Sequence, residues 1–253
     1  MTIADVRIQQ SVVANLSSRP APIEVGPFVI GLDPTTTSPN INYATPRPGA
    51  AITAADVTAL VAAFRAADRK PRLEYVTSCN PELEAILATA GFIVEARHTY
   101  LLCVPGTLKT PPTPDHFDLH QPGTDVQCAA LISAQHDAFG GDAVASEADV
   151  ARLRRLQGAG GVAVMAVTAD GVCAGGGQAV PPTGAVSEVA GIAVRMPYRR
   201  QGLAGAITAD ITRRLFTTGT DVAWLEASGE ESWRVYERVG YRPAGKRLYI
   251  ALS

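Results

Sequence analysis

Two hydrophobic periods alternate along the second half of the chain. Leu203, Ile207, Ile211 and Leu215 recur every four residues, which places them on one face of a helix. Short apolar runs bounded by turn residues predict strands at 162–168, 172–180, 185–194, 223–227 and 248–252. Further helices are predicted at 125–139, 147–156 and 230–239. This succession predicts an α/β (α+β) fold, in which helices flank a mixed sheet.

The first half shows a shorter version of the same pattern. Residues 54–67 have the apolar spacing of a helix, 73–77 a strand, 80–91 a second helix ending at Gly91, and 100–104 a strand. Proline-rich residues 105–122 show neither period and are predicted to be a linker. When the halves are offset by 149 residues, the end of helix 80–91 falls on that of helix 230–239, which indicates a weak internal repeat.

Composition narrows the class of protein. Apolar residues make up 47% and charged residues 18% of the 253 positions, which excludes a disordered or coiled-coil chain. A net charge of −2 argues against a nucleic-acid partner. The four cysteines form no CxxC pair, so we expect buried thiols and neither a metal site nor disulfides. The sequence shows no signal peptide or membrane span, and we expect a soluble, cytoplasmic protein with no membrane partner.

One segment carries recognisable chemistry. The strand predicted at 185–194, which contains Glu188, leads into a basic loop, followed by a helix that begins with small residues at 202, 204 and 205. The free amides of such a helix start can bind phosphate. The glycine spacing fits neither a Walker loop nor a dinucleotide fingerprint. A basic loop that only caps the helix is the structural alternative.

This segment resembles the GNAT superfamily of N-acetyltransferases, whose pyrophosphate loop reads Gln/Arg-x-x-Gly-x-Gly/Ala; Arg199, Gly202 and Ala204 match it. In that family the preceding strand splays from its neighbour and its backbone holds the pantetheine arm of acetyl-CoA. The resemblance implies that acetyl-CoA is the cosubstrate, without a metal. It assigns the arm and the pyrophosphate to Ile192, Ala193, Val194, Arg199, Arg200, Gln201, Gly202, Leu203, Ala204 and Gly205.

Residues 231–241 are similar to the family helix that carries a tyrosine before Gly-Phe, here Gly240-Tyr241. The resemblance implies that Tyr236 protonates the departing thiolate, and a phenol with a pKa near 10 suits that role. Core packing is the alternative for Tyr236. The family often has an asparagine seven positions earlier, where this chain has Gly229. Ser228 and Glu231 are predicted to form a capping box.

The attacking amine must lose a proton, and three side chains are candidates for the base. Glu188, on the strand beside the splay, is our first choice, acting directly or through water. Glu226 on the next strand and His136 in a helix near the acceptor side are the others. A purely structural role remains the alternative for each.

The resemblance extends over about residues 117–253. The first 110 residues are similar only to the C-terminal part of the same fold: Arg47-Pro48-Gly49-Ala50 replaces the phosphate loop, and Leu87 stands where Tyr236 stands in the second half. We therefore predict a tandem GNAT chain with a degenerate N-terminal domain at 1–109, a linker at 110–122 and an N-acetyltransferase domain at 123–253.

The resemblance implies transfer of the acetyl group to a primary amine, by direct attack through a tetrahedral intermediate. The acceptor is then a small-molecule or peptide amine, and the chain is a monomer or a homodimer. Two other functions stay open. One is a non-catalytic module that binds acyl-CoA, and the other is a phosphate site for ordinary nucleotides.

Overall fold

A computed structural model describes residues 1–141, 144–227 and 229–252 of the chain. It divides into two compact units, Met1–Tyr100 with the segment from Ala244 onward, and Leu101–Pro243. The first unit holds α1 (Ile3–Ser17), β1 (Ile23–Val25), β2 (Phe28–Gly31), β3 (Tyr43–Pro46), α2 (Ala54–Ala66), β4 (Arg72–Val76), α3 (Leu83–Thr89) and most of β5 (Phe92–Cys103). The second holds β6 (Phe117–His120), α4 (Asp125–Phe139), α5 (Glu147–Gly158), β7 (Val162–Thr168), β8 (Cys173–Ala179), β9 (Val186–Val194), α6 (Leu203–Thr217), β10 (Val222–Glu226) and α7 (Glu230–Val239). The last strand, β11 (Arg242–Leu252), lies mostly in the first unit.

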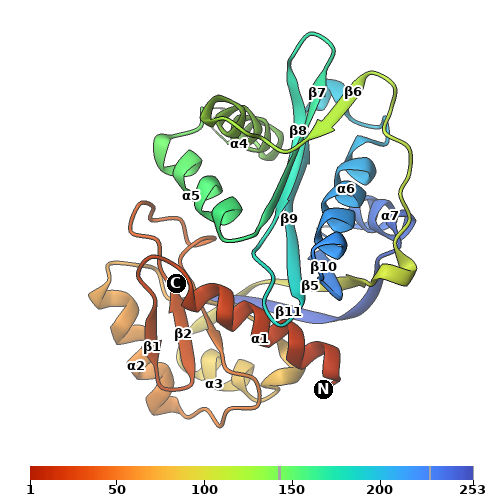
Figure 1. Ribbon diagram of the computed structural model, residues 1–253. Helices are drawn as coiled ribbons and strands as arrows, with labels where there is room; N and C mark the ends of the chain where they lie inside the picture. The colour runs from red at the N-terminus through yellow and green to blue at the C-terminus, as the bar shows by residue number, and fades with distance from the viewer. Residues whose placement is uncertain (142–143, 228, 253) are drawn as a thin grey trace. The chain divides into compact units, whose positions relative to one another are not determined.

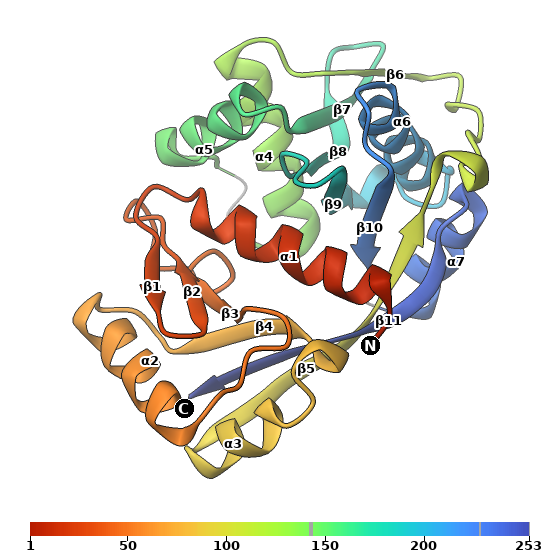
Figure 2. The same cartoon turned by 60° about the horizontal axis from the view of Figure 1, so that its bottom comes forward.

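In the N-terminal unit, helices cover both faces of the sheet (Figure 2). Its strands lie in the order β1-β2-β3-β4-β11-β5, with β3 and β4 parallel and β11 antiparallel to β4. α1 packs on one face, against β2, β3 and β4. α2 and α3 lie on the other, where Leu60, Phe64 and Leu87 are fully buried among strand side chains. Removing this apolar surface from water is the main stabilising contribution to the unit.

In the C-terminal unit the strands lie in the order β5-β10-β9-β8-β7-β6. α4 and α5 cover one face of this sheet, and α6 and α7 the other (Figure 1). The predicted apolar face of α6 is confirmed, since Leu203, Ile207, Ile211 and Leu215 are at most 1% exposed. The central strand β8 contains three consecutive glycines because the neighbouring strands and the flanking helices leave no room for a side chain; a Cβ at Gly175 would lie 2.3 Å from the Ala193 carbonyl oxygen of β9. A Cβ at Gly176 would lie 2.2 Å from Leu131 of α4, and one at Gly177 would lie 3.1 Å from Ile211 of α6.

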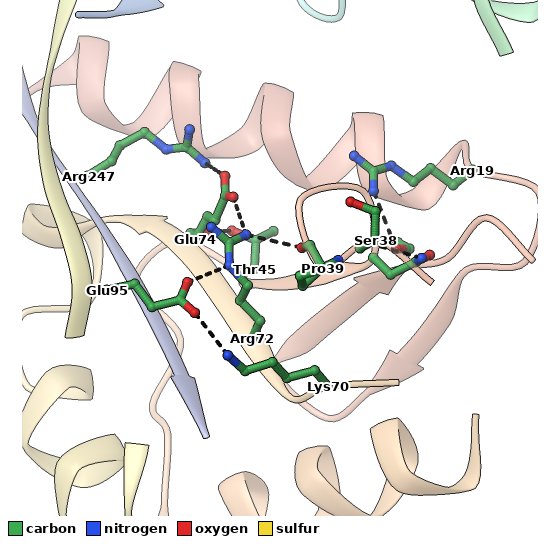
Figure 3. Close-up of polar contacts among 11 residues, drawn as sticks. Arg19, Ser38, Pro39, Thr45, Lys70, Arg72, Glu74, Glu95 and Arg247 are labelled. Atoms are coloured by element: carbon green, nitrogen blue, oxygen red, sulfur yellow. Dashed lines mark hydrogen bonds and ion pairs between the residues drawn. The ribbon is translucent and has the colours of Figure 1, made fainter. Parts of the chain in front are cut away.

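Under α1, the N-terminal sheet buries a network of charges (Figure 3). Glu74 of β4 pairs with Arg72 on its own strand and, at 3.3 Å, with Arg247 of β11. Arg72 also donates to Glu95 at 2.7 Å and lies 4.9 Å from the ring centre of Tyr249. Burial alone would lower the pKa of Arg72, but Glu74 and Glu95 outweigh it and raise that pKa above its ordinary value. The strands are therefore joined by charged side chains as well as by backbone hydrogen bonds.

The predicted helices 125–139 and 230–239 and the strand 162–168 are confirmed to the residue. The prediction for 105–122 was incomplete, because β6 lies inside this segment and pairs with β7. The sequence also gave no signal for α1 or for β1–β3. The division into domains at 109 and 122 differs from the two compact units and stays a prediction.

The four cysteines are buried free thiols, as expected. Among the residues described, no helix is long and apolar enough to cross a bilayer, and no group of three or more metal-ligating side chains is present. The predicted Ser228–Glu231 capping box lies outside the part of the chain that is described. At that helix start, the Ser232 hydroxyl accepts a hydrogen bond from Gly229 N–H at 3.2 Å.

Candidate active site

The candidate site begins where two parallel strands separate. Backbone pairing between β9 and β10 covers only three residue pairs and ends at Glu188 opposite Trp224. β9 continues to Val194, bonded on its other side to β8. After Glu188, β9 therefore has no strand partner on the β10 side. This is the splay that the sequence resemblance implies.

A bulge in β9 lies within the splay. The β8–β9 register shifts near Gly191, whose φ is +64°, a value that L side chains rarely adopt. Gln135 of α4, only 8% exposed, donates from Nε2 to the Gly191 carbonyl at 2.8 Å. A Cβ at Gly191 would meet this nitrogen at 2.6 Å. Gln135 was not identified from the sequence. Its only signal there is that it lies four residues after Leu131, on the buried face of the helix.

The loop after β9 leads to an uncapped helix start. Gly202, with φ +84°, is the N-cap of α6 and supplies no side chain to its first turn. Arg200 is also left-handed, with φ +63°. Within the described chain, no N–H group from Arg200 to Gly205 donates a hydrogen bond to the protein. A Cβ on Gly202 would have no neighbour within 4 Å, so the chain is open at this residue. Free amides at the positive end of a helix dipole suit a phosphate.

The two loop arginines differ in their surroundings. The Arg199 guanidinium donates to the carbonyls of Val194 and Ala138, each at 2.9 Å, so this side chain ties the loop to β9 and to the end of α4. Arg200 is exposed and forms no ion pair within the described residues. Of the two side chains, Arg200 is the one available to an anion, whereas Arg199 holds the loop in place.

Tyr236 lies on α7, packed into the apolar cluster beneath α6. Burial raises the pKa of Tyr236 to about 12. Its hydroxyl makes no hydrogen bond within the described chain, although the residue is only 8% exposed. Tyr241, whose ring centre is 6.3 Å away, instead shares a 2.6 Å hydrogen bond with the Thr212 hydroxyl. A protonated phenol without a protein partner is suited to donate to a ligand.

The candidate bases lie on the opposite face of the sheet from Tyr236. Val189 and Leu225 belong to the cluster beneath α6, so strand alternation places Glu188 and Glu226 on the face covered by α4. His136 is half-buried in the last turn of α4. The acid candidate and the two carboxylates thus lie on different faces of the sheet. Both carboxylates have interactions within the protein, so neither is a free surface group.

A cavity of about 500 Å³ lies elsewhere in the unit. It lies between α6 and the segment that leads into β6, and its walls include Pro111, Phe117, Ala206 and Arg213. None of the predicted site residues lines it.

The comparisons with known proteins agree with this geometry. Comparison with curated proteins found no match. Among solved structures, a GCN5-related N-acetyltransferase from Kribbella flavida is 27% identical, with a TM-score of 0.81 over 99% of this chain and 96% of the other. A second such protein, from Sphaerobacter thermophilus, is 14% identical, with a TM-score of 0.63 over 99% of this chain and 93% of the other.

A tandem GNAT protein from the clavulanic acid biosynthesis pathway is 13% identical, with a TM-score of 0.62 over 99% of this chain and 95% of the other. At this identity the likeness concerns the fold alone. Residues 129–241 match the model of the acetyltransferase (GNAT) family. That match spans α4 to α7 and includes the splay, the open loop and Tyr236. The chain therefore has the GNAT fold, and its residues 129–241 match the GNAT acetyltransferase family model.

Proposed function

We propose that the protein is an N-acetyltransferase that moves the acetyl group of acetyl-CoA to a primary amine. Two observations carry this proposal: β9 has no strand partner on the β10 side after Glu188, and the amides from Arg200 to Gly205 at the uncapped start of α6 are open. An acyl-CoA has matching chemistry along its length, with an amide-containing arm followed by a pyrophosphate. The Kribbella flavida relative is described as an N-acetyltransferase, which is in line with the proposal.

The end of β9 and the loop that follows it bind different parts of acetyl-CoA. The backbone of Ile192, Ala193 and Val194 lies along the pantetheine arm, with the Val194 carbonyl already bonded to Arg199, and the amides from Arg200 to Gly205 bind the pyrophosphate. The Arg199 side chain keeps this loop against β9. Arg200 adds a positive charge beside the phosphate.

Proton transfer is assigned to two groups on opposite sides of the sheet. Glu188 accepts the proton of the amine as its nitrogen attacks the thioester carbon, directly or through water. Tyr236 gives its proton to the sulfur as the carbon–sulfur bond of the tetrahedral intermediate breaks. A pKa of about 12 keeps Tyr236 protonated at neutral pH, so the phenol holds a proton that it can donate as the bond breaks. We further propose a cytoplasmic location, where acetyl-CoA is available.

Two glycines at opposite ends of α6 give a matched test. Gly202 and Gly219 are both left-handed, and a Cβ at either would have no neighbour within 4 Å. Gly202→Glu puts a carboxylate into the phosphate site, whereas Gly219→Glu makes the same change at the far end. At 100 times its Kd, acetyl-CoA stabilises the folded state by about 2.7 kcal/mol, or roughly 5–10 °C in Tm for a chain of this size.

We expect wild type and Gly219→Glu to show this thermal shift and Gly202→Glu to lose it, and ATP and NAD to give none. A panel of primary amines then tests transfer, with release of free CoA thiol as the signal. No binding of acetyl-CoA by the folded wild type would refute the proposal. Binding without transfer to any amine would favour the non-catalytic acyl-CoA module instead.

A further inference from the structure

The N-terminal unit also contains a parallel strand pair that separates. β3 and β4 share one backbone register pair, Ala44 opposite Leu73. Beyond it, side chains join the strands: the Thr45 hydroxyl donates to the Glu74 carbonyl at 2.7 Å (Figure 3). Topologically this pair corresponds to β9 and β10, since in each unit the two strands are parallel and a helix connects them.

A glutamine side chain lies in this separation. Gln9 of α1 is completely buried. Its Nε2 donates to the Pro46 carbonyl and to the Thr45 hydroxyl, each at 2.7 Å, and its Oε1 accepts from Val76 N–H at 2.8 Å. The amide thus bonds the end of β3 on one side and the end of β4 on the other. It offers the donor and acceptor that an amide of a pantetheine arm would offer.

In the loop after β3, backbone N–H groups also have hydrogen-bond partners within the protein. Arg47 N–H donates to the Pro27 carbonyl at 2.8 Å, and Gly49 N–H donates to the Cys79 carbonyl at 3.0 Å. The corresponding loop after β9 leaves its amides from Arg200 to Gly205 open. The N-terminal loop therefore has fewer donors to offer a phosphate.

The helix that follows this loop is capped by the chain itself. The Thr53 hydroxyl accepts from Asp56 N–H at 3.3 Å, and an Asp56 carboxylate oxygen accepts from Thr53 N–H at 2.8 Å. A carboxylate thus occupies the start of α2, whereas the start of α6 at Gly202 has no side-chain cap. Its negative charge repels a second anion from this position.

We propose that the Gln9 side-chain amide takes the place of a ligand in the N-terminal unit by filling the separation of β3 and β4. The chain then binds a single acyl-CoA, at its C-terminal unit. This inference rests on the proposed function for the number of bound molecules. The filling of the strand separation by Gln9 can be tested without any acyl-CoA.

The first experiment counts binding sites by calorimetric titration with acetyl-CoA. We expect one site per chain in wild type and none in Gly202→Glu. Two sites, or one site that survives Gly202→Glu, would overturn the inference while leaving acyl-CoA binding intact. No site at all in wild type would contradict the proposed function and with it the expected count of one.

The second experiment follows hydrogen exchange of the Val76 amide in the protein without ligand. Gln9→Met keeps the length of the side chain and removes both bonding groups, and Gln10→Met makes the same change at the exposed neighbouring position. We expect Val76 exchange to accelerate at least about tenfold, and Tm to fall by several degrees, in Gln9→Met but not in Gln10→Met. Equal Val76 exchange in the two variants would overturn the assignment of Gln9, whatever the titration shows.

Discussion

Removing the hydroxyl of Tyr236 separates catalysis from packing, because Tyr241 provides a control in the same cluster. Tyr236→Phe takes away a group with no hydrogen-bond partner within the described chain, so no partner is left unsatisfied. Tyr241→Phe removes a buried 2.6 Å hydrogen bond to Thr212. A general acid contributes about 10²–10⁴-fold in rate, and a buried hydrogen bond about 1 kcal/mol in stability. Tyr236→Phe should therefore lose activity and keep its stability, whereas Tyr241→Phe should keep its activity and lose stability.

We expect Tyr236→Phe to lower kcat by at least about 100-fold, with Tm within about 1 °C of wild type. Tyr241→Phe should keep kcat and lose about 2–4 °C in Tm, the shift that about 1 kcal/mol produces in a chain of this size. Release of CoA thiol measures the first quantity and thermal unfolding the second. A Tyr236→Phe variant with kcat within threefold of wild type would refute the role as acid. A loss of Tm equal to that of Tyr241→Phe would instead identify Tyr236 as a core residue.

Two further predictions concern the base and alkaline pH. Glu188→Gln should lower kcat about 10²–10⁴-fold without weakening acetyl-CoA binding, and the remaining rate should rise with pH as the free amine forms. The control variant Glu147→Gln, at an exposed position, should resemble wild type. An unchanged pH–rate profile in Glu188→Gln would exclude Glu188 as the base. Burial raises the pKa of four tyrosines, Tyr75, Tyr100, Tyr236 and Tyr241. The unfolded chain loses these protons near pH 10, while the folded protein keeps them. The free energy of unfolding should therefore be unaffected by these groups below pH 10 and should fall as the pH rises towards 12. The fall is up to about 1.4 kcal/mol per pH unit for each tyrosine. Denaturant unfolding across this range measures the slope, and phenolate absorbance of all seven tyrosines titrating together near pH 10 in the folded protein would contradict it.

The sequence predicts best those elements whose apolar side chains follow one regular spacing. The large aliphatic side chains of α6 recur at every fourth position, and β7 is an almost continuous apolar run, so the sequence predicts both elements. α1 is not, because Asp5, Gln9 and Ser11 share its buried face with aliphatic side chains and dilute the helical period. β1, β2 and β3 have three or four residues each, too few to show an alternation that turns and prolines do not mask.

Some residues of the candidate site could be predicted from the sequence, and others could not. The loop and Tyr236 were recognisable because their spacing matches a known motif. Gln135 and Gln9 were not, because a glutamine in a sequence resembles a surface residue, and its role comes from a backbone carbonyl brought to it by a distant part of the chain. Gln9 bonds Val76 across 67 positions, which no local pattern can report.

The place of β11 has a consequence for biosynthesis. Residues 247–251 pair with β4, and Arg247 reaches Glu74 across 173 positions of sequence. A ribosome that has released the first hundred residues has therefore released a sheet that still lacks one of its inner strands, with Glu74 deprived of one partner. Such a chain cannot complete its first unit before its second has been made. The earlier segment keeps an open sheet edge until residues 247–251 have left the exit tunnel.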